Sequence, residues 1–189
     1  MSMTPLADLL AARPDLTADV ADWRTRLHDR PLRLETAAAA LSHDVLDVLD
    51  AVDQAQALGG AMLTLSSLRD ACCRLCATAS ETLAVVVEAR EGRRPAIAAE
   101  HLPTFIGRVD GLLAAGFLET AGPDAVPLDV YARMLRNRAQ AVVHGLRYLA
   151  EGADPAYDVG QTHEHEVVEL IALALVLPIA LPAPSLTPA

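Results

Sequence analysis

A long stretch of helical periodicity before Gly92 is the feature that most limits the folds open to this chain. Over residues 61–91, apolar side chains recur every three or four positions, as they do on the buried face of an α-helix. The residues of this stripe are Leu65, Leu68, Cys72, Leu75, Cys76, Ala79, Leu83 and Val86. The opposite side of the same helix carries Asp70, Arg74, Glu81 and Glu88. The pattern predicts one long amphipathic helix that ends at Gly92.

The same period predicts further helices over 35–58, 128–151 and the segment that follows Asp158 and ends before Pro178. A shorter stripe between Pro14 and Pro31 predicts another helix, and smaller helical pieces are expected over 4–13 and 95–118, with a loop over 116–126. Hydrophobic residues make up 52% of the chain but aromatic residues only 3%. A core of Ala, Leu and Val suits helices better than a sheet. We therefore expect an all-α fold, a bundle of about four main helices with shorter capping helices and no sheet.

The length and the distribution of breaks favour one domain. A chain of 189 residues is sufficient for a single full core, and no stretch reads as a linker between two domains. The segment 179–189 is rich in proline. We expect a single helical domain over 1–178 and a proline-rich C-terminal tail over 179–189.

The charge excludes several classes of function. The formal net charge is −10, which disfavours binding to nucleic acid and to anionic membranes. All 15 basic residues are arginine, so no lysine Schiff base can form. The longest apolar run, 170–177, is too short to span a bilayer. The three cysteines lie within 72–76 and no secretory signal is evident, which predicts free thiols and a cytoplasmic protein.

Three groups of possible metal ligands are better explained without a metal. Cys72 and Cys76 belong to the buried stripe, where cysteine usually packs as a small hydrophobe, whereas Cys73 is turned towards the flank and expected to be partly exposed. His163 and His165 are two residues apart and point ~200° apart on a helix, so they cannot chelate one ion. The third group lies on the solvent side of its helix: His43, Asp47, Asp50 and Gln54. We expect no metal and no cofactor.

Two polar residues on expected inward faces are the candidate site. Arg138 interrupts an apolar stripe that includes Tyr131, and His163 aligns with Val167 on the inward face of the last helix. A buried guanidinium needs a partner, which is either an internal carboxylate or an anionic ligand. His163 is the best candidate for a general base, although inward histidines are more often structural. The predicted site is thus His163 as the catalytic residue, with Arg138, Tyr131 and Val167 binding the ligand.

Two functions remain open at this point. The first is a small-molecule protein with an internal apolar pocket, which binds a small apolar or anionic metabolite and could act on it without a cofactor. The second is a non-catalytic module for protein interaction or oligomerisation. Because every residue of 170–177 is apolar, that segment is either central in its own fold or covered by a second chain, and we expect a homodimer.

Overall fold

The computed structural model describes residues 13–59, 62–92, 128–152 and 159–180. These ranges contain helices and no strand, so the all-α prediction is confirmed. The helices are α2 (Pro14–His28), α3 (Leu34–Ala57), α4 (Met62–Glu91), α7 (Leu128–Ala150) and α8 (Val159–Ala180). The predicted pieces over 4–13 and 95–118, the loop over 116–126 and all but the start of the C-terminal tail lie outside the described residues.

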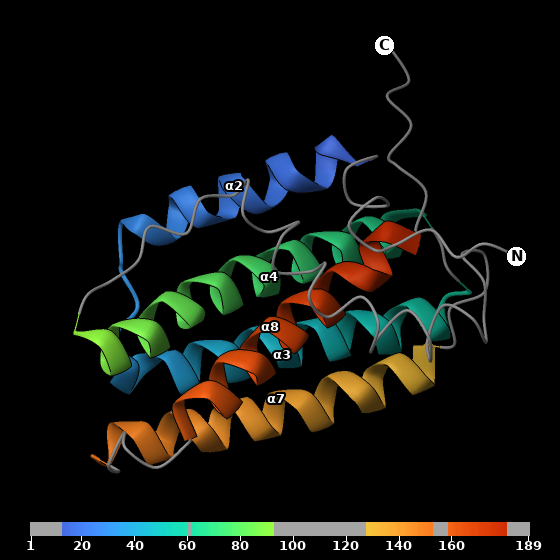
Figure 1. Cartoon of the computed structure of the whole chain (residues 1–189). Helices are drawn as coiled ribbons and strands as arrows, with labels where there is room; N and C mark the ends of the chain where they lie inside the picture. Colours follow the sequence, from blue (N-terminus) through green and yellow to red (C-terminus); the bar gives the residue numbers. More distant parts are fainter. Residues whose placement is uncertain (1–12, 60–61, 93–127, 153–158, 181–189) are drawn as a thin grey trace, which may run out of the picture.

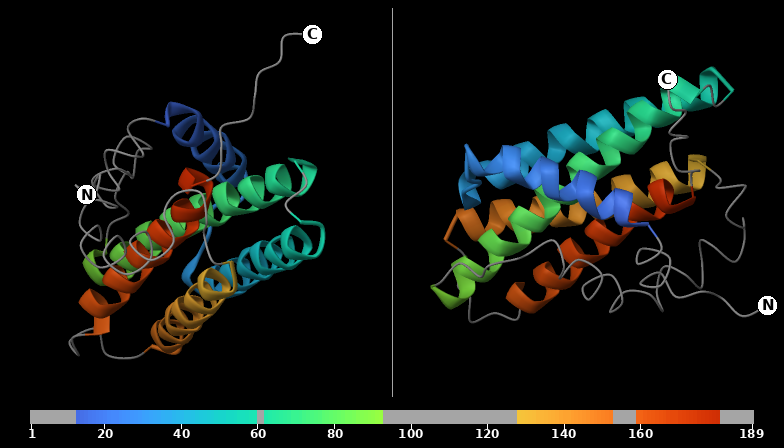
Figure 2. Two further views of the ribbon diagram at one scale, coloured as in Figure 1. Left: turned by 90° about the vertical axis from the view of Figure 1, so that its right-hand side faces the viewer. Right: turned by 90° about the horizontal axis from the view of Figure 1, so that it is seen from above.

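Four of these helices form the bundle. Each packs against two others in the ring order α3, α4, α8, α7, and neighbours run antiparallel (Figures 1 and 2). Short connections after α3 and α7 make each of those helices the antiparallel partner of the one that follows it in the chain. Helices on the diagonals of the ring, α3 with α8 and α4 with α7, therefore run parallel.

The remaining helix, α2, lies against the outer side of α4 and runs in the same direction (Figure 1). Its apolar stripe is short: Leu16 and Val20 are buried, and Trp23 is only partly buried. Polar contacts supplement this stripe, because the indole Nε1 of Trp23 donates to Asp70 of α4 at 3.0 Å. Because α2 packs on this outer side, α4 is covered on three sides, by α2, α3 and α8.

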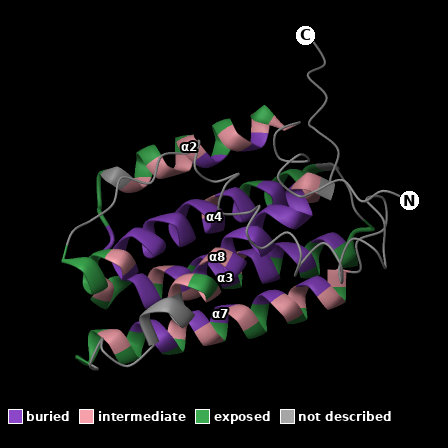
Figure 3. Ribbon diagram, viewed as in Figure 1, coloured by how far each residue is buried: buried purple, intermediate pink, exposed green. Residues whose placement is uncertain are grey.

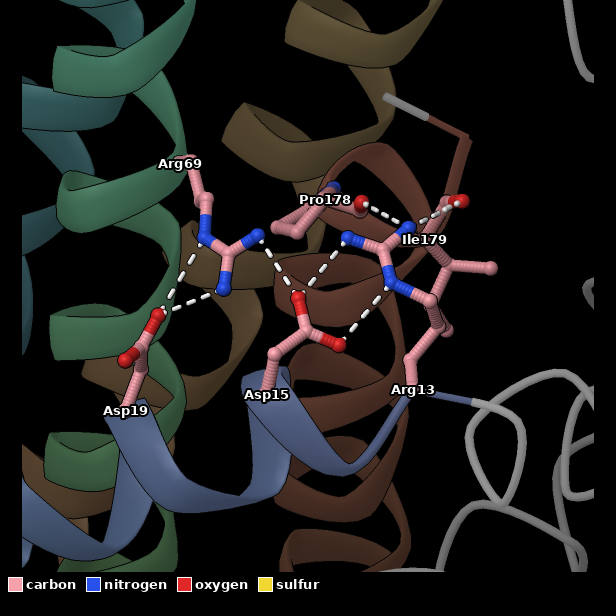
Figure 4. A network of polar contacts seen from close by, with 6 residues as sticks. All are labelled: Arg13, Asp15, Asp19, Arg69, Pro178 and Ile179. Carbon is pink, nitrogen blue, oxygen red and sulfur yellow. Dashed lines mark hydrogen bonds and ion pairs between the residues drawn. The ribbon is translucent and has the colours of Figure 1, made fainter. Parts of the chain in front are cut away.

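A chain of charges also joins α2 to α4 and to the end of α8 (Figure 4). Arg69 of α4 contacts Asp19 at 2.6 Å and Asp15 at 2.9 Å. Asp15 in turn accepts hydrogen bonds from Arg13, whose Nη1 donates to the carbonyl oxygens of Pro178 and Ile179 at 3.4 and 3.3 Å. A cation at this position donates hydrogen bonds to carbonyls at the end of α8 and interacts favourably with the negative end of the helix dipole.

Two predicted helix ends are confirmed, and one is wrong. Gly92 and Gly152 follow α4 and α7 with φ of 69° and 81°, a region that glycine adopts without a steric cost. The last helix was expected to end before Pro178, but α8 continues through this proline to Ala180. Proline removes one backbone donor from the helix, and the contacts of Arg13 lie at this same end of α8.

Which residues of a helix are buried depends on how many neighbouring helices cover it, and not only on its apolar stripe (Figure 3). From Leu75 to Val86 every residue of α4 is buried, including Glu81, which the sequence had placed on the solvent side. That expectation was wrong because α2 covers this side of α4, where Arg24 pairs with Glu81. The sequence of α4 shows one apolar stripe, whereas the fold buries almost its whole circumference.

The apolar run 170–177 of α8 is buried within its own chain. Each of its residues is at most 2% exposed, because α8 packs against α4 and α7. The run therefore needs no second chain to cover it, and the homodimer stays a prediction without this support. None of the helices in the described part of the chain has the length and apolarity that crossing a bilayer requires.

Candidate functional site

Tyr131, predicted to bind a ligand, is fully buried near the start of α7, where this helix meets α4 and α8. Its hydroxyl donates to the carbonyl oxygen of Leu173 at 3.0 Å and lies 3.8 Å from the sulfur of Cys72. Burial raises the pKa of Tyr131 well above its usual value, so the phenol stays protonated. In these contacts the hydroxyl joins α7 to α8 and α4.

Arg138 meets an internal carboxylate. Its side chain is 34% exposed, and its guanidinium pairs with Glu169 of α8, which is 7% exposed. The other carboxylate oxygen of Glu169 lies 2.9 Å from Nε2 of His165. Of the two partners expected for this arginine, the structure contains the internal carboxylate.

The two remaining residues of the predicted site lie on α8. Val167 is buried in the core. The backbone of His163 belongs to α8, but its side chain lies outside the described part of the chain. The predicted juxtaposition of Arg138 and His163 in one internal pocket therefore stays a prediction.

The cysteine cluster is wholly internal. Cys72, Cys73 and Cys76 are free thiols that are at most 1% exposed. The expected partial exposure of Cys73 is wrong, because its side of α4 is also covered. Burial raises the pKa of Cys72 and Cys73 to about 12 and that of Cys76 well above its usual value. Protonated, enclosed thiols are poor nucleophiles and poor metal ligands.

His43, Asp44 and Asp47 form the one group of possible metal ligands among the described residues. Their ligand atoms lie within 4.8 Å of one another. However, Arg74 of α4 pairs with both carboxylates, and the hydroxyl of Thr78 donates to Asp44 at 2.5 Å. The arginine contacts both carboxylates and compensates one of their two negative charges, so the cluster is explained as an ion-pair network between α3 and α4.

A groove of about 600 Å³ lies between α3 and α7. On the α3 side it is lined by Ser42, Val45, Leu46 and Leu49. Leu46 is 59% exposed, one of four large apolar side chains that stand out from the described surface. This leucine lies outside the buried stripe of α3, and it gives the groove an apolar side that water can reach.

The α7 side of the groove is polar and cationic. It is lined by Arg136, Gln140, His144 and Arg147, together with Ala139 and Val143. Among the described residues, no aspartate or glutamate belongs to the lining. Neither Arg136 nor Arg147 has an ion-pair or hydrogen-bond partner in the part of the chain that the structure describes. Two guanidinium groups therefore border an apolar floor, formed by Val45, Leu46, Leu49 and Val143, and no anion of the described residues compensates them.

A second hollow, of about 450 Å³, lies where the start of α3 meets the end of α4. Its charged lining residues have both signs: Arg33, Glu35 and Glu88. This mixture gives no preference for a cation or an anion, and the groove between α3 and α7 is the better candidate site.

Sequence reasoning missed this groove because it sought misplaced polar residues on inward faces. Arg136 and Arg147 are both exposed on α7, so neither is a misplaced polar residue in an apolar stripe. The available signal was Leu46, an apolar residue outside the stripe of its own helix. No protein family model, curated protein or solved structure matches this chain.

Proposed function

We propose that this protein binds a small amphipathic anion in the groove between α3 and α7. The observation that carries the proposal is the charge of the lining. The chain has 25 acidic and 15 basic residues, yet the charged residues of the groove are Arg136 and Arg147, with His144 beside them. A local cationic site on an acidic protein attracts a small anion, while the overall charge disfavours large polyanions.

The apolar floor of the groove contributes binding free energy that exposed charges alone cannot provide. An ion pair between exposed groups contributes only ~0–1 kcal/mol. Covering about 100 Å² of apolar surface, by contrast, contributes roughly 2.5 kcal/mol. A ligand with an apolar body over Leu46 and Val143 and an acidic head at a guanidinium would use both. The volume of about 600 Å³ lies in the range of small-molecule sites.

We assign the ligand to this groove rather than to Arg138 because of charge compensation. Arg138 already has Glu169 as its counterion, and a ligand anion there would compete with a buried carboxylate. Arg136 and Arg147 have no such competitor among the lining residues. The sequence predicted a small apolar or anionic ligand in an internal pocket; the proposal specifies an amphipathic anion and moves its site to the surface of the bundle.

Location and assembly are proposed separately. Three free cysteines fit a reducing compartment, and the cytoplasm is our proposed location. A homodimer also stays a proposal, and ligand binding in the groove does not depend on it.

Calorimetric titration with decanoate, a simple amphipathic anion, tests the proposed function. We expect saturable binding that is about tenfold weaker when Arg136 and Arg147 are both replaced by glutamine. Arg133→Gln is the matched control, because Arg133 is exposed on the same helix and does not line the groove. Loss of affinity in both variants to the same extent would indicate general attraction to a cationic helix and would contradict the site.

A second pair of variants tests the apolar floor. Leu46→Ser should weaken decanoate binding about tenfold, whereas Leu63→Ser should leave it unchanged, since Leu63 is 84% exposed and lies on α4 away from the groove lining. If neither decanoate nor decyl phosphate binds at millimolar concentration, the proposed function is wrong. In that case interaction with another protein becomes the better explanation of the groove.

A further inference from the structure

We infer that the ligand of the α3–α7 groove is elongated and carries an anionic group at each end. This inference rests on the proposed function and goes further, because it specifies the ligand class. It starts from the positions of Arg136 and Arg147, which are both exposed and both line the groove. The question is whether the two guanidinium groups act on one anionic head or on two.

The helix geometry separates the two arginines. They are eleven positions apart on α7, which turns the second by only ~20° from the first and moves it roughly 16 Å along the axis. They therefore lie on one line of the helix surface at opposite ends of the groove. Side chains of a helix lean towards its N-terminus, so Arg136 leans away from Arg147, and a single carboxylate or phosphate is too small to contact both.

Each arginine has a hydrogen-bonding neighbour about one helical turn away. Gln140 follows Arg136 by four positions, and His144 precedes Arg147 by three, so each pair shares a face of α7. Both neighbours line the groove. The two ends of the groove are thus similar: each has a guanidinium and a second polar group suited to an acidic head.

Between the two arginines the groove carries no permanent charge. On α7, Val143 lies between Gln140 and His144, and Leu46 and Leu49 line the opposite wall from α3. The permanent charges therefore lie at the two ends of the groove, and the α3 wall between them is apolar. A molecule with two acidic ends and a hydrocarbon middle, such as a long dicarboxylate or a related diacid, has the complementary order.

The size of the groove favours such a small molecule over a docked helix of another protein. A stable protein interface buries ~800 Å² on each partner, and a partner helix would extend beyond the roughly three helical turns between the two arginines. A volume of about 600 Å³ suits one extended small molecule. We therefore commit to the dianionic small molecule as the occupant.

This inference is tested by calorimetric titration of the full chain with hexanedioate, nonanedioate, dodecanedioate and hexadecanedioate. Each diacid is compared with the monocarboxylate of the same carbon number. We expect the diacid to exceed its monocarboxylate by tenfold or more at one intermediate length. Shorter diacids cannot reach both arginines. Arg136→Gln and Arg147→Gln should each remove this advantage while leaving monocarboxylate binding at the other end, and Arg133→Gln should preserve it.

The outcomes separate the inference from the function on which it rests. If diacids never exceed their monocarboxylates by more than the statistical factor of about two, while both bind in the groove, the inference fails and the proposed function stands. The same conclusion follows if affinity only rises steadily with chain length. If an acidic amphipathic peptide binds more tightly than every diacid, the occupant is a protein segment and the inference is overturned. If no member of either series binds, the proposed function fails as well.

Discussion

Arg24 of α2 and Glu81 of α4 form an ion pair in which the side chains are only 11% and 10% exposed. The Nη2 and Nε atoms of the guanidinium both donate to one carboxylate oxygen, at 3.0 and 3.2 Å. Because α2 has a short apolar stripe, this pair is a principal polar link between α2 and the bundle. The link requires both charges, since either alone would be buried without compensation.

Glu81→Gln should therefore lower the free energy of unfolding by about 3 kcal/mol. The change leaves the guanidinium of Arg24 buried beside a neutral amide. Urea denaturation followed by far-ultraviolet circular dichroism measures the effect. Asp22→Asn is the matched control: Asp22 pairs with Arg26 at the surface, with side chains 59% and 61% exposed, and its loss should cost under ~1 kcal/mol. Equal effects of the two changes would contradict the importance of burial.

Asp15 predicts a dependence of stability on pH. The hydrogen bond from Arg13, followed by the contacts with Arg69, lowers the pKa of Asp15 from 3.8 to about 2. Because the pKa is lower in the folded state, the stabilisation is complete above pH ~4 and is lost as pH falls towards 2. A third of this side chain is exposed, so we expect a contribution of only about 1 kcal/mol.

Asp15→Asn should remove this contribution and flatten the stability profile between pH 4 and pH 2 by about that amount. Urea midpoints measured across this range provide the test. Asp50→Asn is the control, since Asp50 is exposed on α3 and forms no ion pair with any residue that the structure describes. A profile of Asp15→Asn that parallels the wild type would show that Asp15 does not contribute.

The hydroxyl of Tyr131 predicts a stability effect without an effect on ligand binding. Tyr131→Phe leaves the buried carbonyl of Leu173 without this donor and should cost about 1–2 kcal/mol. Tyr148→Phe, at a tyrosine that is 46% exposed on the same helix, should cost almost nothing. If Tyr131→Phe instead weakened decanoate binding with the stability unchanged, the ligand site predicted from the sequence would be favoured over the groove.

The apolar periodicity predicted the helices because each long helix has at least one face in the core. The stripe over 61–91 and the stops at Gly92 and Gly152 correspond to α4 and to the ends of α4 and α7. The number of neighbours of each helix could not be predicted this way. Glu81 and Cys73 appeared to face solvent or the flank, and both are buried because α2 adds a second cover to α4.

The candidate site was harder to predict for a related reason. Arg138 stood out because it interrupts an apolar stripe, but whether a carboxylate meets it depends on how α7 and α8 align, which one sequence does not specify. Glu169 supplies that carboxylate from the other helix. The groove is formed by α3 and α7, which are far apart in the chain, so neither helix alone indicates that Leu46 and Arg147 border one hollow.

The buried thiols predict slow chemical modification. Since Cys72, Cys73 and Cys76 are enclosed and remain protonated well above neutral pH, iodoacetamide should leave the native protein unlabelled for hours at pH 8. Unfolding in urea should expose all three to rapid labelling, as mass spectrometry would show. Ser66→Cys, at an exposed position on α4, is the positive control for reagent access. Rapid labelling of any native cysteine in the wild type would contradict the described packing of α4.

Arg138→Met distinguishes a structural arginine from a ligand-binding one. The substitution keeps much of the apolar stem and removes the cation that pairs with Glu169, whose side chain is 10% exposed. The Glu169 carboxylate then retains His165 as a charged partner only when that imidazole is protonated. We expect a loss of about 2 kcal/mol in the free energy of unfolding, since a buried carboxylate is left without its permanent counterion. Glu169→Gln should cost less, because Arg138 is one-third exposed and can be solvated when unpaired. Decanoate binding, measured in the same preparations by calorimetry, should be unchanged in both variants. If Arg138→Met instead weakens binding tenfold while the unfolding midpoint stays in place, the ligand lies at the interior site predicted from the sequence and not in the groove between α3 and α7.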